Sequence, residues 1–365
     1  MRTNRQQLYD KIYLLGDIWV LNRFLNFRAW RKQVGKRPAP EFLKIYREEI
    51  LPYWKQFGRH PKKLWFRHYY NTLGTIGPRY IPDDIHCRYI VPFFDNPLYE
   101  RQLEDKNLYS MVFPDVKRPE TVFKYFGPTY FSARAVGFCN EDFTPITRQE
   151  AIDRLSAGGR FILKPTRDTG EGKDIRVFTA GEGGEDIPSL LDSYKGVDFI
   201  VQRFVSQHPD LAAFNASSLN TIRLITMVWE GQPRILSGII RIGSAGNPVD
   251  NIAAGGYQVG IDTDTGTLKK QAFTYAGGIG AEQTAEGKVF GGFPIPSWEK
   301  LRDTAMQCAL RLPHLKLIGW DFAIDEKGDV VLIELNCHFG QTQSSNGPTF
   351  GDLTEEVLTA VFGRR

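Results

Sequence analysis

Two short apolar segments near the C-terminus carry the residues best suited to chemistry. They read IGWDFAI over residues 318–324 and VVLIELN over residues 330–336. Alternate side chains of a strand point to one face, so Glu334 and Asn336 project together, and an antiparallel neighbour can add Asp321. Carboxylate and amide oxygens are ligands that Mg²⁺ prefers, completed by water and phosphate oxygens. A lone acidic residue at a strand end is common, but a buried carboxylate is costly unless it is paired or binds a metal. We therefore expect Asp321, Glu334 and Asn336 to be metal ligands.

A second candidate site lies at Lys164, which ends the predicted strand of residues 160–164 and is followed by the glycine-rich loop 166–173. A lysine in this position can reach the phosphates of a nucleotide, and a flexible loop can close its backbone N–H groups over them. This signal is weak alone, because glycine loops beside a lysine occur in many surface hairpins. Protein kinases place the glycine loop before the lysine, and the Gly-Lys-Ser/Thr phosphate-loop signature is absent from the chain.

The elements that would position these residues form an α+β pattern. Strands are predicted over 160–164, 175–178, 199–205, 221–229, 234–242 and 257–262, and a hairpin over 315–324 and 329–335. Helical periodicity is found over 297–312, where Ser297 can cap the first turn, and over 353–362. The strands and helices alternate without the strict rhythm of a parallel sheet, which favours an α+β fold.

The first hundred residues differ from the rest of the chain. They are rich in aromatic and basic residues, and Leu14, Ile18, Leu21 and Leu25 repeat at helical spacing. Residues 1–70 contain 16 Lys and Arg against 5 Asp and Glu, so they carry +11 and the remaining residues carry −7. This asymmetry indicates either an anionic partner, such as a glycan or a membrane surface, or a basic helical layer on an acidic body. No nucleic-acid motif is found, so no nucleic-acid partner is expected.

Length and composition describe an ordinary globular protein. The chain has 365 residues, of which 42% are hydrophobic and 24% are charged, enough for two or three packed subdomains. Its four cysteines are too few and too scattered for a disulfide framework, which favours a reducing, cytoplasmic location. The apolar stretch of residues 12–21 is interrupted by Asp17 and is too short to span a bilayer. We expect neither a signal peptide nor a transmembrane helix.

Taken in order, these segments resemble the ATP-grasp superfamily of carboxylate–amine ligases. The matching pieces are FILKP at 161–165, the glycine loop, IVQRFV at 200–205, and the closing GWD and IELN of the hairpin. EDKN at 104–107, PDV at 114–116, QHP at 207–209 and NTIRLIT at 220–226 resemble the sugar-transfer-associated branch. The resemblance covers residues 100–345. It implies two α+β subdomains that grip ATP, over residues 101–202 and 203–365, after a mainly helical region over residues 1–100.

The resemblance also implies roles for single residues. Lys106 and Lys164 would contact the nucleotide phosphates, and Asp321, Glu334 and Asn336 would bind Mg²⁺. The lid loop would contribute Thr169, Gly170 and Gly172, and the hinge that binds adenine would contain Gln202, Arg203, Phe204 and Val205. Gln202 stands where many relatives have glutamate. Arg241, and Arg223 as a second candidate, would hold the acyl phosphate and stabilise the oxyanion. After Asn336 the chain lacks the Pro-Gly turn of many ligases, which leaves the substrates open.

The implied activity is an ADP-forming ligation of a carboxylate to an amine through an acyl phosphate, with ATP and Mg²⁺ as cofactors. The branch implies polysaccharide or glycoconjugate biosynthesis, such as the joining of a sugar acid to an amino acid, so the substrates would be small molecules or glycan-linked. Two alternatives stay open: a phosphotransferase on the same scaffold, and a non-catalytic protein that binds an anionic glycan or a membrane surface. Contact of residues 1–70 with the inner membrane face, and the oligomeric state, are also left open.

Overall fold

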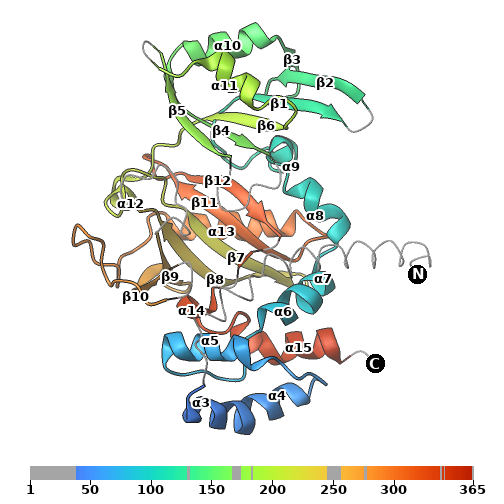
Figure 1. Ribbon diagram of the computed structural model, residues 1–365, viewed down its shortest axis with the longest axis vertical. Helices are drawn as coiled ribbons and strands as arrows, with labels where there is room; N and C mark the ends of the chain where they lie inside the picture. The colour runs from blue at the N-terminus through green and yellow to red at the C-terminus, as the bar shows by residue number, and fades with distance from the viewer. Residues whose placement is uncertain are drawn as a thin grey trace.

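The computed structural model describes residues 38–129, 132–166, 174–181, 184–244, 256–274, 278–337, 339–340 and 342–363, with the backbone alone for residues 101, 129 and 132–136. Three layers follow one another along the long axis of the molecule (Figure 1): a first sheet, a second sheet, and a group of helices that contains both early and late parts of the chain. No helix in these described ranges is both long and apolar enough to cross a membrane.

The first sheet has six antiparallel strands in the order β3-β2-β1-β6-β4-β5. Its strands are β1 (Thr121–Thr129), β2 (Ser132–Cys139), β3 (Pro145–Ile146), β4 (Gly159–Pro165), β5 (Arg176–Ala180) and β6 (Phe199–Arg203). Phe123, Phe161 and Phe199 are buried on one face, in a core shared with helices α10 (Arg148–Ser156) and α11 (Ile187–Ser193). Alternation of side chains therefore turns Lys164 and Gln202 to the other face, toward the second sheet.

The second sheet has six antiparallel strands in the order β10-β9-β8-β7-β11-β12. Its strands are β7 (Ile222–Trp229), β8 (Gln232–Ile242), β9 (Tyr257–Asp262), β10 (Thr267–Phe273), β11 (Leu317–Ile324) and β12 (Val330–Asn336). The predicted hairpin is confirmed, and Asp321 lies opposite Glu334 in its register. Trp320 and Phe322 are buried in the core that contains α13 (Trp298–Leu310). Asp321, between them in sequence, therefore faces the opposite side of the sheet.

Ser297 occupies the expected N-cap position of helix α13, but its side chain does not cap the first turn. Ser297 has φ 55° and makes no side-chain cap hydrogen bond. Its hydroxyl instead donates to the carbonyl of Gly328 at 2.7 Å, in the turn between β11 and β12. The serine thus ties the start of α13 to the hairpin that carries Asp321 and Glu334.

The helical character predicted for the early chain is confirmed for the described residues before the first sheet. The elements are α3 (Pro40–Ile45), α4 (Leu51–Lys55), α5 (Lys63–Leu73), α6 (Asp83–Ile85), α7 (Val91–Phe94), α8 (Pro97–Leu103) and α9 (Tyr109–Val112), with π-helical turns at Tyr46–Ile50 and His86–Ile90 and a 3-10 turn at Lys106–Leu108. Of these elements, α3 to α7 together with α15 (Thr354–Phe362) bury a core that includes Trp54 and Phe66, and also Ile225, Met227 and Leu317 of the second sheet. Ile225 and Met227 share a face with Arg223 by alternation along β7. The helical layer therefore covers one half of the sheet face whose other half carries Asp321.

The segment that follows β12 fastens the helical layer to the sheet. Its short helix α14 (Gln343–Asn346) begins with Gln343, whose side chain is fully buried. The Gln343 amide accepts from the N–H of Ile81 at 2.8 Å and donates to the carbonyl of Ile81 at 2.8 Å and to the hydroxyl of Tyr69 at 3.0 Å. A second amide N–H, from Thr349, reaches the same oxygen at 3.3 Å.

Replacing Gln343 by leucine is expected to lower the free energy of unfolding by about 2–4 kcal/mol, because the buried partners of the amide lose their hydrogen bonds. Urea denaturation of the whole chain measures this change. Gln102→Leu, on an exposed position of α8, is the matched control and should change stability by less than about 0.5 kcal/mol. Equal losses in the two variants would contradict the role given to Gln343.

Candidate active site

The centre of the candidate site is the carboxylate of Asp321, which is fully buried. Arg223 binds it with two nitrogens, Nε to Oδ1 at 2.7 Å and Nη2 to Oδ2 at 2.7 Å. Arg241 donates from Nη2 to Oδ2 at 2.9 Å. Burial raises the pKa of Asp321, but the two arginines outweigh burial and hold that pKa well below its usual range. Asp321 is therefore ionised at neutral pH.

The other two predicted metal ligands lie on the neighbouring strand. Glu334 faces Asp321 across the β11–β12 pair, and Asn336 lies opposite Gly319. The amide nitrogen of Asn336 is 3.3 Å from Oδ2 of Asp321. Lys106, from the segment that precedes the first sheet, forms an ion pair with Glu334 at 3.0 Å. The structure thus brings Asp321, Glu334 and Asn336 together, as the sequence predicted.

Lys164 lies on β4 of the first sheet, on the face that looks toward this cluster. Only 5% of the residue is exposed, and no ion pair or hydrogen bond of its ammonium is found among the residues that the structure describes. Burial, with the nearby charge of Lys106 as a second cause, lowers the pKa of Lys164 to about 8, while Glu334 acts in the opposite direction. A buried ammonium without a partner is suited to an anionic ligand.

The charges of the cluster favour a polyanion. Lys106, Lys164, Arg223 and Arg241 supply four cationic groups, whereas Asp321 and Glu334 supply two carboxylates. The excess of positive charge is distributed over both sheets. A ligand with several phosphate oxygens could therefore contact both subdomains through charge-assisted hydrogen bonds.

The segment predicted to be a hinge begins in β6 and continues beyond it. The N–H groups of Arg203 and Phe204 donate to the carbonyls of Glu120 and Arg160, each at 2.9 Å. In contrast, the N–H of Val205 has no hydrogen-bond partner within the described part of the chain. The Arg203 side chain lies on the face of the sheet that carries Phe199, with its Nε 3.0 Å from the Glu120 carboxylate, and so points away from the face that carries Gln202.

Within the segment predicted to be a hinge, the Gln202 side chain lies on the face of β6 opposite Phe199 and lines a pocket. Its Nε2 donates to the carbonyl of Pro119 at 3.4 Å, and its Oε1 is buried without a hydrogen-bond partner in the described structure. The remaining predicted nucleotide ligands, Thr169, Gly170 and Gly172 of the lid loop, lie outside the described residues.

The donor set around Asp321 fits Mg²⁺. Oδ1 of Asp321 accepts a hydrogen bond from Nε of Arg223, and a carboxylate oxygen has a second lone pair that can bind a metal. Glu334 adds a second carboxylate, and the amide of Asn336 adds a third oxygen. No group of three or more His, Cys, Asp or Glu side chains suited to a metal is found in the described ranges. Two carboxylates and one amide therefore leave positions for water and phosphate oxygens, as Mg²⁺ normally requires.

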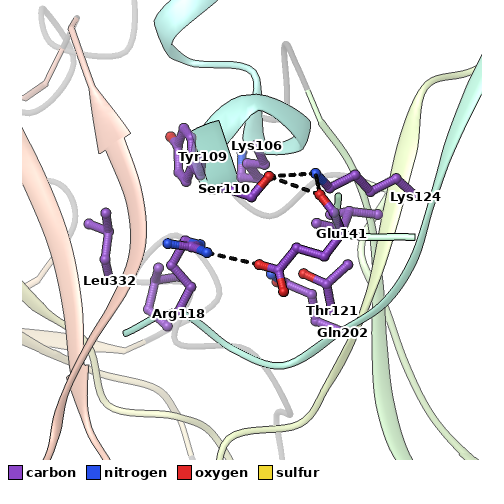
Figure 2. A pocket seen from close by; sticks show the side chains of 11 residues that line it. Lys106, Tyr109, Ser110, Arg118, Thr121, Lys124, Glu141, Gln202 and Leu332 are labelled. Carbon is purple, nitrogen blue, oxygen red and sulfur yellow. Dashed lines mark hydrogen bonds and ion pairs between the residues drawn. The ribbon is translucent and has the colours of Figure 1, made fainter. Parts of the chain in front are cut away.

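A pocket that was not predicted from the sequence opens beside Lys106 and Gln202 (Figure 2). It is also lined by Tyr109, Ser110, Arg118, Thr121, Lys124, Glu141, Ile200, Leu332 and Ile333. Lys124 is almost completely buried, and it donates to the Ser110 hydroxyl at 2.8 Å and to the Glu141 carbonyl at 2.7 Å. Burial lowers the pKa of Lys124 to about 8. A lysine inside an otherwise aromatic strand was the signal that could have identified this pocket.

The model of the sugar-transfer associated ATP-grasp family matches residues 101–357 of the chain. This range contains all of the site residues described above. The chain belongs to the sugar-transfer associated ATP-grasp family. The two antiparallel sheets with flanking helices are its ATP-grasp fold, and the helices described from residue 38 to residue 100 precede the matched region.

Solved structures of ATP-grasp enzymes resemble this member of the family at low identity. The biotin carboxylase domain of 2-oxoglutarate carboxylase from Hydrogenobacter thermophilus, in complex with MgADP, is 14% identical, with a TM-score of 0.42 over 72% of this chain and 46% of that chain. D-alanine–D-alanine ligase from Bacillus anthracis, complexed with ATP, is 13% identical, with a TM-score of 0.40 over 74% of this chain and 68% of that chain. The chain thus spans less than half of the carboxylase chain. No curated protein matches it.

Proposed function

We propose that this protein is an ATP-dependent ligase that joins a carboxylate to an amine, with release of ADP and phosphate. The observation that carries the proposal is the cluster in which four cationic side chains from both subdomains surround the Asp321 and Glu334 carboxylates. Family membership supports ATP chemistry. Because a fold supports many substrates, the choice of substrates is a further part of the proposal.

The nucleotide would lie between the two sheets. Lys164 and Lys106 would bind its phosphates, since the first has no partner in the described structure and the second already reaches the Glu334 strand from the other subdomain. The base would lie against the hinge, where the N–H of Val205 and the Oε1 of Gln202 offer a donor and an acceptor. Adenine presents the matching acceptor and donor at its N1 and its 6-amino group.

Asp321, Glu334 and Asn336 would hold Mg²⁺. When bound there, the metal would supply positive charge to the phosphate oxygens and neutralise the charge that develops during phosphoryl transfer. The two arginines keep Asp321 ionised and fix its orientation, so they are positioning residues for the metal site as well as candidates for the substrate.

The chemistry would proceed in two steps. A carboxylate oxygen of the acceptor attacks the γ-phosphorus of ATP, the bond to the β–γ bridging oxygen breaks, and ADP leaves. The amine nitrogen then attacks the carbonyl carbon of the acyl phosphate, phosphate leaves, and the nitrogen loses a proton. Arg223 donates hydrogen bonds to Asp321 from Nε and Nη2. Its Nη1 could then donate to the acyl phosphate or to the tetrahedral oxyanion.

We infer that the reaction belongs to polysaccharide or glycoconjugate assembly in the cytoplasm, for example the joining of a sugar acid to an amino acid. The support is the branch of the family, sugar-transfer associated ATP-grasp. The basic residues 1–70 would contact an anionic glycan or the inner membrane face, and residues 1–37 of that region lie outside the described structure.

Hydroxylamine tests the acyl phosphate directly. With ATP, Mg²⁺ and a panel of sugar acids and amino acids, the protein is expected to form a hydroxamate together with ADP, because hydroxylamine captures an activated acyl group. A phosphorylated product that is stable to hydroxylamine would show that the acceptor is a hydroxyl group. The proposed activity would then be a phosphotransferase and not a ligase.

The low pKa of Lys164 predicts the pH dependence of nucleotide binding. Above pH 8 the free protein loses the positive charge of Lys164, so the affinity for ATP is expected to fall, by at most about tenfold per pH unit. Titration calorimetry between pH 7 and pH 9.5 measures the slope. Lys164→Arg keeps its charge over this range and should bind with a flatter profile. An identical slope in the wild type and in Lys164→Arg would contradict this assignment.

The lowered pKa of Lys164 also makes the free energy of unfolding depend on pH. Between pH 8 and pH 10.5 the unfolded chain still holds the proton of Lys164 and the folded chain does not. The contribution of this residue to the free energy of unfolding without nucleotide therefore increases with pH over that range.

A further inference from the structure

Strand β12 lies at the edge of the second sheet, and the segment of residues 104–117 runs along its free edge. Because β12 is the last strand in the order of that sheet, its outer N–H groups need partners from outside the sheet. Residues 104–117 belong to neither sheet. Figure 2 shows Tyr109 and Lys106 on this segment, across a small pocket from Leu332 of β12. We call residues 104–117 the edge strap.

The edge strap binds the outer N–H groups of β12 with three oxygen atoms. The pairs are the Lys117 carbonyl with Leu332 at 2.8 Å, the Tyr109 hydroxyl with Leu335 at 2.9 Å, and Oε1 of Glu104 with Cys337 at 2.8 Å. Two of these acceptors are side-chain atoms, so a substitution can remove them without a change in the backbone. Tyr109 is also buried, which keeps water from replacing its hydroxyl easily.

The register of β12 contains a bulge immediately before Glu334. Glu334 lies opposite Asp321. The next pair along the strands is Leu332 with Phe322, so Ile333 is an extra residue on β12. In a regular strand the side chains of Leu332 and Glu334 would point to the same face. The bulge instead puts Leu332 in the core and Glu334 beside Asp321. The position of the proposed metal ligand therefore depends on this register.

The spacing of the acceptors on the edge strap matches the bulged register. The outer N–H groups of a regular antiparallel strand are two residues apart. The donors to the Lys117 carbonyl and the Tyr109 hydroxyl are three residues apart, because Ile333 lies between them as the extra residue. A slip of one residue would reverse the faces of the side chains. The two acceptors therefore favour the register in which Glu334 reaches the site.

The edge strap is anchored in both sheets, so it can hold β12 in place. The backbone N–H of Lys106 donates to the carbonyl of Thr166, directly after β4, at 3.3 Å. The ring of Tyr109 packs edge-on against Phe113, with 5.8 Å between the ring centres. Phe113 in turn packs against Trp320 of β11. The Tyr109 hydroxyl is thus presented to β12 from a fixed ring.

We propose that the edge strap holds the bulged register of β12, and that Tyr109 and Glu104 are positioning residues for Glu334 and Asn336. The inference rests on the proposed Mg²⁺ site. The two side chains act through the strand and not by contact with the metal. Their hydrogen bonds fix the residues on both sides of Asn336.

Hydrogen exchange tests the edge strap without any ligand. Exchange of the backbone N–H groups of residues 330–337 is measured by mass spectrometry on the full chain. Tyr109→Phe leaves the N–H of Leu335 without its acceptor, so exchange in this segment is expected to become about tenfold faster. Tyr46→Phe is the matched control, because its buried hydroxyl donates to the Pro61 carbonyl within the helical layer. It should leave exchange of residues 330–337 unchanged.

ATP binding tests the link to the metal site. The gain in ATP affinity on addition of Mg²⁺ is measured by titration calorimetry, with EDTA in the metal-free samples. The gain is expected to fall about three- to tenfold in Tyr109→Phe and in Glu104→Met. Glu104→Gln should lose less, because its amide oxygen can still accept from the N–H of Cys337. Tyr46→Phe should keep the gain of the wild type.

The outcomes separate this inference from the proposed function. Equal exchange of residues 330–337 in the wild type and Tyr109→Phe, or equal acceleration in Tyr109→Phe and Tyr46→Phe, would overturn the role of the edge strap. An unchanged gain from Mg²⁺ in Tyr109→Phe and Glu104→Met would overturn its role at the metal site.

A wild type that does not bind ATP would instead overturn the proposed function, and the exchange rates would still decide whether the edge strap holds β12. Circular dichroism shows which variants are folded. If Tyr109→Phe is unfolded, Glu104→Met takes its place in the exchange experiment, with the same expected result and the same contradiction.

Discussion

Glu334→Gln is expected to reduce Mg²⁺-dependent ADP formation about 10²–10³-fold while the protein stays folded. The carboxylate of Glu334 lies opposite Asp321 in the β11–β12 register and pairs with Lys106, so its loss removes one of the two negative ligands proposed for Mg²⁺. Removal of a single preorganised electrostatic group at a reacting centre typically has an effect of this size. Steady-state ADP release at saturating ATP, repeated over a range of Mg²⁺ concentrations, measures the change.

Glu326→Gln is the matched control for this experiment. Glu326 is an exposed residue in the turn of the same hairpin. The same chemical change there should leave ADP formation within about twofold of the wild type, because an exposed charge outside the site affects the chemistry little. If Glu334→Gln were as active as Glu326→Gln, the metal site would have to be placed elsewhere.

Arg223→Met is expected to lower the free energy of unfolding by about 3–5 kcal/mol, because it leaves the fully buried carboxylate of Asp321 with Arg241 as its one remaining arginine. Chemical denaturation at pH 7 measures the loss. The arginine pair holds the pKa of Asp321 below its usual range. Its contribution to stability is therefore fully present at neutral pH, declines once the pH falls below the usual carboxyl pKa, and is lost as the pH falls through the lowered pKa.

Arg148→Met provides the comparison, since Arg148 forms an ion pair with Asp192 on the surface at 3.0 Å, with both side chains well exposed. An exposed pair contributes less than about 1 kcal/mol. In addition, Arg223→Met/Asp321→Asn should recover part of the stability lost in Arg223→Met, because the buried negative charge is removed. A double variant no more stable than the single one would contradict the assignment of the loss to an unpaired carboxylate.

The strands that carry chemistry could be predicted because their signals are local. In the hairpin of β11 and β12, acidic residues interrupt apolar strands, and the turn between them is polar. Strand β1 was not predicted, since Lys124, Gly127 and Pro128 disturb the alternation that marks a strand. Strand β10 lies at the edge of its sheet and contains two lysines in seven residues, so its sequence resembles a surface loop.

The partners of the site residues could not be predicted, because they depend on strand register over long separations. Arg223 is 98 residues from Asp321, and Arg241 is 80 residues from it. The family resemblance predicted a role for both arginines, but not that they bind the carboxylate expected to hold the metal. The same limit applies to Glu141, which follows β2 and meets Arg118 only after the first sheet packs on the segment before it.

The central claim is that ATP cleavage drives the joining of a carboxylate to an amine. Mass spectrometry of reactions that contain the full chain, ATP, Mg²⁺ and pooled sugar acids and amino acids tests it most directly. The account predicts ADP, phosphate and a product whose mass is that of the acid plus the amine minus water, all strongly reduced in Glu334→Gln. AMP in place of ADP, or ADP with a phosphorylated sugar and no condensed product, would contradict it.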